Sequence, residues 1–112
     1  MSGFAEYDRY DAVGLADLVR KREASAAELL AEAVKRCDRA NPRLNAVVYR
    51  LDADAERAAN AVDLDRPFAG VPFLVKDLGP PLACAPLTCG SRLFANYVPE
   101  EDGEGCRASR SA

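Results

Sequence analysis

A lysine at the end of an apolar run is the residue of this chain best suited to do chemistry. The run from Val71 to Val75 leads directly to Lys76, and Asp77 follows it. A near-continuous apolar run is typical of a strand that is covered on both faces. Pro72 lies near the start of the run, where a strand tolerates proline. We therefore expect a buried strand with an ammonium group at its carboxyl end.

The surroundings of Lys76 decide whether its amine is charged or neutral. Burial removes hydration and favours the neutral amine, which accepts protons. Free lysine titrates near pH ~10.4, so a pKa of about 7–8 requires roughly 3–5 kcal/mol from the surroundings. Asp77 would oppose that shift, but alternation along a strand points its carboxylate to the opposite face. The residues alone leave two interpretations open: a buried general base, or an exposed lysine that pairs loosely with a carboxylate.

The segment Gly70–Asp77, which reads Gly-Val-Pro-Phe-Leu-Val-Lys-Asp, resembles the lysine motif of the amidase signature hydrolases. The likeness extends upstream to Asn41–Val48 and downstream to Thr88–Ser91 and Pro99–Asp102, and it covers roughly residues 10–102. The resemblance implies that Lys76 is the general base of a Ser–cis-Ser–Lys triad. It also implies hydrolysis of carboxamide carbon–nitrogen bonds through a serine acyl-enzyme. The substrates would be small linear, aryl or cyclic amides, and no metal or organic cofactor would be required.

The two serines of that triad cannot be assigned in this chain. In the family they lie well downstream of the lysine, in a segment of the Gly-Gly-Ser-Ser-Gly-Gly type. The residues after Lys76 contain no such segment, and Gly90-Ser91 matches a different family position. We therefore expect a truncated and inactive fragment of an amidase. The alternatives are a non-catalytic amidase-like fragment with a binding or structural role, and the amidase subunit of a tRNA-dependent amidotransferase.

Periodic patterns predict the elements that precede the lysine. Apolar residues at helical spacing predict one helix from residue 11 and a second from Ser25, where Ser25 and Glu28 make a capping box. Asn41-Pro42 is expected to end the second helix. The β-favouring run Leu44–Leu51 predicts a strand, and an alanine-rich stripe predicts a third helix that opens at residue 52 or 54.

Together these patterns predict an α/β fold, with N-terminal helices and the first strands of the mixed sheet of the amidase-signature fold, left incomplete. We expect a loose arm over residues 1–10, the N-terminal part of an amidase domain over residues 11–102, and a divergent, disordered tail over residues 103–112. An incomplete sheet exposes an apolar edge, so self-association through that sheet is expected.

The composition excludes several classes of function. A hydrophobic content of 49% argues against intrinsic disorder. A formal net charge of −3 means that the chain lacks the excess of basic residues typical of proteins that bind nucleic acid. No apolar run approaches the ~20 residues that cross a bilayer, which argues against a membrane partner. The first residues lack the basic start and apolar core of a signal peptide, so a cytoplasmic location is expected.

The chain has four cysteines and no histidine. Without histidine, catalysis that depends on an imidazole is excluded within these residues. The cysteines form no C-x-x-C pair, which argues against a zinc site. Cys84 and Cys89 lie five apart in a proline-containing loop and could approach one another, so a disulfide and two free thiols both remain open.

Overall fold

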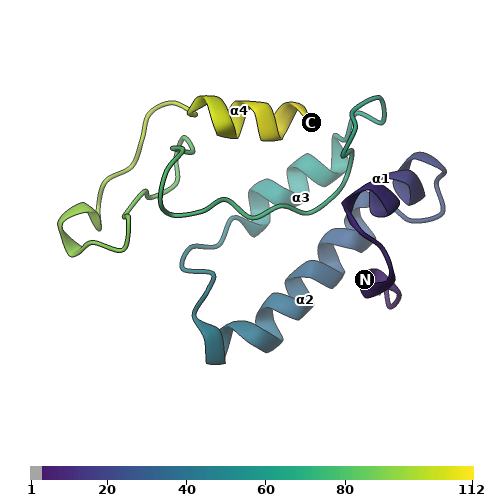
Figure 1. The fold of residues 1–112 in the computed structure, drawn as a ribbon, viewed down its shortest axis with the longest axis horizontal. Coiled ribbons are helices and arrows are strands. Elements are labelled where there is room, and N and C mark those ends of the chain that lie inside the picture. The colour runs from purple at the N-terminus through teal and green to yellow at the C-terminus, as the bar shows by residue number, and fades with distance from the viewer. Residues whose placement is uncertain (1–3) are drawn as a thin grey trace. The chain divides into compact units, whose positions relative to one another are not determined.

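The computed structural model describes residues 4–112, and all regular elements in that range are helices. They follow one another as shown in Figure 1: a short 3-10 helix η1 (Tyr7–Arg9), α1 (Ala12–Arg20), α2 (Ala26–Leu44), α3 (Asp52–Asn60), a second 3-10 helix η2 (Arg92–Phe94), and α4 (Glu104–Ser111). The chain forms two compact units, a first unit Met1–Pro72 and a second unit Phe73–Ala112.

The predicted α/β fold class is wrong for this structure, because neither expected strand forms within residues 4–112. A strand exists only through hydrogen bonds to a neighbouring strand, and side-chain preference for strands largely reflects packing against such neighbours. The run from Val71 to Val75 has no regular secondary structure and no partner strand among the described residues. Phe73 and Leu74 are accordingly 69% and 75% exposed.

The other expected strand is replaced by a turn that folds back onto the end of α2. The Asn41 amide group donates to the Val47 carbonyl at 2.9 Å and accepts from the Val47 N–H at 2.8 Å. These are the backbone groups with which Val47 would pair to a neighbouring strand. Because one side chain takes both of them, the β-favouring residues that follow α2 are held as irregular backbone.

The start of α2 agrees with the prediction and its end does not. The Ser25 hydroxyl accepts from the Glu28 N–H at 3.1 Å, and the Glu28 carboxylate accepts from the Ser25 N–H at 2.8 Å, which completes the capping box. The helix continues past the expected stop and includes Pro42. Pro42 has no N–H to donate to the carbonyl four residues earlier, so the helix continues past it with one hydrogen bond missing near its end. The helix ends at Leu44, and the capping residue Asn45 has a left-handed φ of 48°.

The core of the first unit lies between α1 and the start of α2. Its buried members are Leu15, Val19, Ala24 and Leu29, and Leu29 is fully buried. Partly buried apolar residues pack around them: Phe4, Tyr7, Leu18, Leu64 and Val71. The helix α3 packs against α2 (Figure 1). The first residue of the lysine run therefore contributes to this core.

One guanidinium group joins the end of α2 to the start of α3. Arg50 donates to Asp38 at 2.7 Å and to Asp52 at 2.6 Å. The hydrogen bond from Arg50 lowers the pKa of Asp52, and the two carboxylates raise the pKa of Arg50. The connection between the helices is therefore held by charge as well as by packing.

A second cluster of charges lies on α2. Arg36 donates to Asp8 at 2.5 Å and to the buried carboxylate of Glu32 at 2.7 Å, and it lies 5.3 Å above the Tyr7 ring. Burial raises the pKa of Tyr7. Residues 4–10 of the predicted loose arm thus contact α2 and the core, whereas residues 1–3 lie outside the described range.

The second unit is mostly loop, closed by backbone hydrogen bonds between distant residues. The Leu87 N–H donates to the Tyr97 carbonyl at 3.0 Å, and the Gly103 N–H donates to the Pro81 carbonyl at 2.8 Å. The helix α4 occupies the tail for which the sequence predicted no regular structure, and its Cys106 is buried. No helix in the described part of the chain is both long and apolar enough to span a bilayer.

Candidate functional site

The lysine motif begins with a glycine that packs tightly on the first unit. Gly70 has a left-handed φ of 77°. A Cβ atom at this position would lie 2.9 Å from the Ala26 Cβ and 3.1 Å from the Val19 Cγ1. Only glycine combines this backbone conformation with so close an approach. The start of the motif is therefore fixed against α1 and α2.

Lys76 lies near the end of the motif on an exposed, irregular segment. The predicted burial of the run is not found, because Phe73, Leu74 and Val75 are 69%, 75% and 38% exposed. The Lys76 side chain is exposed too, and it forms no hydrogen bond or ion pair with any described residue. Its amine is thus accessible and free of an anionic partner within residues 4–112.

The neighbouring carboxylate of Asp77 is bound by a residue eleven positions later. The Thr88 N–H donates to Asp77 Oδ1 at 2.7 Å, and the Thr88 hydroxyl donates to Oδ2. The hydroxyl hydrogen bond, followed by backbone N–H groups of Thr88 and Cys89, lowers the pKa of Asp77. Sequence reasoning missed this pairing. The available signal was Thr88 itself, a hydroxyl residue inside the downstream segment that shares the family likeness.

The serine nearest the lysine in sequence has a structural role. The Ser91 hydroxyl accepts from the Leu93 N–H at 3.2 Å and so caps the short helix η2. The Ser91 hydroxyl thus serves the local helix, and that Gly90-Ser91 is not the catalytic nucleophile stays a prediction.

The cysteines do not form the disulfide that the sequence left open. Cys84 and Cys89 are both free and exposed, and both have left-handed φ values, 65° and 52°. Cys106 is free and buried, and Cys37 is free and half-buried. In the described part of the chain no group of three or more His, Cys, Asp or Glu side chains is placed to hold a metal ion.

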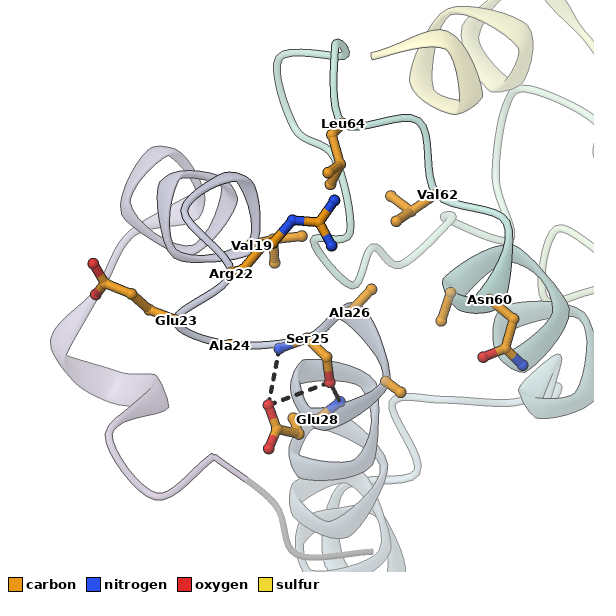
Figure 2. A pocket seen from close by; sticks show the side chains of 12 residues that line it. Val19, Arg22, Glu23, Ala24, Ser25, Ala26, Glu28, Asn60, Val62 and Leu64 are labelled. Carbon is orange, nitrogen blue, oxygen red and sulfur yellow. Dashed lines mark hydrogen bonds between the residues drawn. The ribbon is translucent and has the colours of Figure 1, made fainter.

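The first unit has an open hollow of about 900 Å³, shown in Figure 2. It is walled by small and apolar side chains such as Val19 and Ala26, and Arg22 extends toward Val62 and Leu64. The Ser25 hydroxyl on its wall is held by the capping box. The hollow therefore offers no activated nucleophile, and Lys76 does not line it.

The family comparison places these residues among amidases. The family described as Amidase matches residues 28–112, a range that contains Lys76, Asp77 and Thr88 and reaches through the tail. No solved structure matches the chain.

Several curated proteins are similar to parts of the chain. A lipoamidase of Enterococcus faecalis is 41% identical over 76 residues, covering 67% of this chain and 10% of that protein. A 6-aminohexanoate-cyclic-dimer hydrolase of Paenarthrobacter ureafaciens is 43% identical over 68 residues, covering 61% and 13%. A glutamyl-tRNA(Gln) amidotransferase subunit of Acidothermus cellulolyticus is 36% identical over 112 residues, covering 93% and 22%.

The chain thus spans between 10% and 22% of the length of these three relatives. The family match covers most of the chain, and it includes the lysine motif with the Asp77–Thr88 pair. On this ground the chain belongs to the amidase signature family.

Proposed function

We propose that this chain supplies Lys76 as the general base of an amidase that hydrolyses carboxamide carbon–nitrogen bonds. One observation carries the proposal: Lys76 completes the lysine motif with an amine that has no ionic partner among residues 4–112. A general base must release its proton before it can accept another. An ammonium group that is ion-paired with a carboxylate would resist that release, and Lys76 has no such ion pair among residues 4–112.

The proposed reaction passes through a serine acyl-enzyme. A serine attacks the amide carbonyl carbon, and its proton passes through a bridging serine to the neutral amine of Lys76. Backbone N–H groups stabilise the oxyanion, the carbon–nitrogen bond breaks, and the leaving amine takes up the proton. Water then releases the acid from the serine. Lys76 is the participant that these residues provide.

The two serines have no counterpart in this sequence, which lacks a Gly-Gly-Ser-Ser-Gly-Gly segment. Removing a triad member leaves only a residual rate. We therefore propose that the 112-residue chain alone does not hydrolyse amides. We further propose that in an active enzyme other polypeptide covers the exposed run before Lys76, because burial favours the neutral amine.

A transplant tests the role of the lysine. The matched segment of the Paenarthrobacter hydrolase is replaced by the corresponding segment of this chain, and hydrolysis of the 6-aminohexanoate cyclic dimer is measured. We expect activity that Lys76→Ala reduces at least ~1,000-fold, the scale of losing a triad member. Lys76→Arg serves as the charge-matched control, because arginine keeps the charge and cannot lose its proton.

Two results would contradict the proposal. A transplant that remains active after Lys76→Ala would show that Lys76 is not the base. The isolated chain hydrolysing a simple aryl amide, at a rate that Lys76→Ala abolishes, would show that no further serine segment is needed.

A second candidate is the amidase subunit of a tRNA-dependent amidotransferase. It is favoured by extent of match: the Acidothermus amidotransferase subunit matches 93% of this chain, whereas the Paenarthrobacter hydrolase matches 61%. The same transplant into the Acidothermus protein, assayed together with the other chains of its amidotransferase, separates the two. Activity there but not in the hydrolase would favour the second candidate. Inactivity in both would favour a non-catalytic fragment.

A further inference from the structure

Both oxygens of the carboxylate that follows Lys76 are bound by one residue. Asp77 Oδ1 accepts from the Thr88 N–H at 2.7 Å, and Oδ2 accepts from the Thr88 hydroxyl. Hydrogen bonds to an ionised carboxylate are among the stronger ones in proteins. We call this two-point contact the Asp77–Thr88 clasp. It closes a loop whose first residue directly follows the lysine.

The clasp fixes the backbone at the point where the exposed run ends. Residues 73–76 make no backbone hydrogen bond with any described residue. Asp77 is the first residue after this run at which a strong contact holds the chain. The far side of the loop is anchored in turn by the backbone bond from Leu87 to Tyr97 at 3.0 Å. The position of Lys76 therefore depends on a neighbour that is itself held at two atoms.

The clasp also keeps the carboxylate of Asp77 ionised and directed toward Thr88. Both carboxylate oxygens of Asp77 face Thr88. The Thr88 hydroxyl and N–H lower the pKa of Asp77, so the carboxylate stays ionised while it is bound. No ion pair joins Asp77 to Lys76 in the described residues.

We propose that Asp77 is a positioning residue for Lys76: bound to Thr88, it fixes the chain directly after the lysine and keeps its carboxylate from pairing with the lysine ammonium. This inference rests on the proposed function, because it concerns the amine that acts there as base. A base misplaced by about 1 Å costs on the order of 100-fold in rate. A base paired with a carboxylate also holds its proton more tightly.

The test uses the full 112-residue chain and two substitutions at the same position. Thr88→Val removes the hydroxyl donor and keeps the shape, whereas Thr88→Ser keeps the donor and serves as the matched control. The pKa of Asp77 is measured from its carboxyl carbon by NMR. We expect a pKa below the ordinary ~3.9 in the wild type and in Thr88→Ser, and a higher pKa in Thr88→Val.

The reactivity of Lys76 is measured on the same proteins by competitive amine labelling across a pH range, with Lys21 and Lys35 as internal references. In Thr88→Val the carboxylate keeps only the contact of Oδ1 with the backbone N–H of residue 88. Oδ2 is freed to pair with the ammonium, and labelling of Lys76 slows about two- to five-fold, the scale of an exposed ion pair. Adding Asp77→Asn to Thr88→Val removes the anion and restores the labelling rate. A purely structural role for the clasp predicts no such restoration.

Two outcomes would overturn the inference. One is an ordinary pKa for Asp77 in the wild type, a measurement that stands even where Thr88→Val fails to fold. The other is an unchanged Lys76 labelling rate in a folded Thr88→Val protein whose Asp77 pKa has risen.

These readouts need no amide hydrolysis, so they separate this inference from the proposed function. In an active transplant, Asp77→Ala should lower kcat about 100-fold and leave KM unchanged, because the base acts in the chemical step. A transplant that folds but is inactive would contradict the proposed function. If Lys76 labelling still slows in Thr88→Val and recovers with Asp77→Asn, the inference about the positioning of Lys76 would nevertheless be supported.

Discussion

Gly70 shows how one residue ties the lysine motif to the helices before it. Its left-handed φ of 77° and the 2.9 Å that would separate an added Cβ from Ala26 both demand a residue without a side chain. The next residue, Val71, packs on the core formed by α1 and α2. The backbone that leads toward Lys76 thus starts from a fixed point.

We predict that Gly70→Ala destabilises the chain by about 2–4 kcal/mol, the sum of left-handed strain and overpacking. Urea unfolding followed by circular dichroism measures the loss. Gly90→Ala is the matched control, since Gly90 has a φ of 67° and nothing within 4 Å of an added Cβ. Equal losses in the two variants would show that the contact with Ala26 contributes nothing.

Sequence reasoning singled out Lys76 but did not predict its surroundings. Lys76 is recognisable because it lies in a short, contiguous segment that resembles the lysine motif of the amidase signature hydrolases. The partner of Asp77 was missed because the contact with Thr88 depends on the path of the intervening loop. Pairing rules for strands or helices do not describe such a path, and Pro80 and Pro81 indicate only that it is a loop.

The helices and the expected strands show the same limit: local sequence predicts local contacts but not contacts between distant residues. The starts of α1 and α2 were predicted because each depends on residues within one turn, such as the Asp11 carboxylate that accepts from the Gly14 N–H at 2.8 Å. The helix α3 begins at Asp52, one of the two predicted positions, but no side chain caps it. The strands were predicted from β-favouring residues, but a strand also needs a neighbour. Asn41 takes the backbone groups of Val47, and the run before Lys76 has no partner strand in the described range.

At the start of α2, we predict that Ser25→Ala lowers the free energy of unfolding by about 1 kcal/mol, because the Glu28 N–H loses its acceptor. Thermal unfolding monitored by circular dichroism gives the change. Ser25→Asp keeps a capping acceptor and should stay close to the wild type. A Ser25→Asp protein as unstable as Ser25→Ala would argue that the hydroxyl acts through something other than capping.

At the scale of the whole molecule, the notable feature is that the second unit exposes several large apolar side chains. Phe73, Leu74 and Leu93 are 69%, 75% and 83% exposed. Exposed apolar residues close together in a monomer are a common cause of association. The self-association expected from an open sheet edge is therefore still proposed, but its ground is now the exposure of these apolar side chains.

We predict that the isolated chain forms concentration-dependent oligomers, which sedimentation velocity measures. Replacing Phe73 and Leu74 together by Phe73→Asp and Leu74→Ser should shift the chain toward monomer. Val13→Asp, at a site on α1 that is 60% exposed, adds charge elsewhere and should not. A compact wild-type monomer across the concentration range would refute the prediction.

The guanidinium of Arg50 lies between carboxylates at the end of one helix and the start of the next. Exposed charge pairs of this kind lose strength as dissolved ions accumulate around them, and the screening distance falls from about 8 Å at physiological ionic strength to about 3 Å at 1 M. The angle between α2 and α3 should therefore be best defined in dilute buffer. At high salt concentration the two helices would keep their apolar contacts but lose the ion pairs of Arg50 that hold their connection.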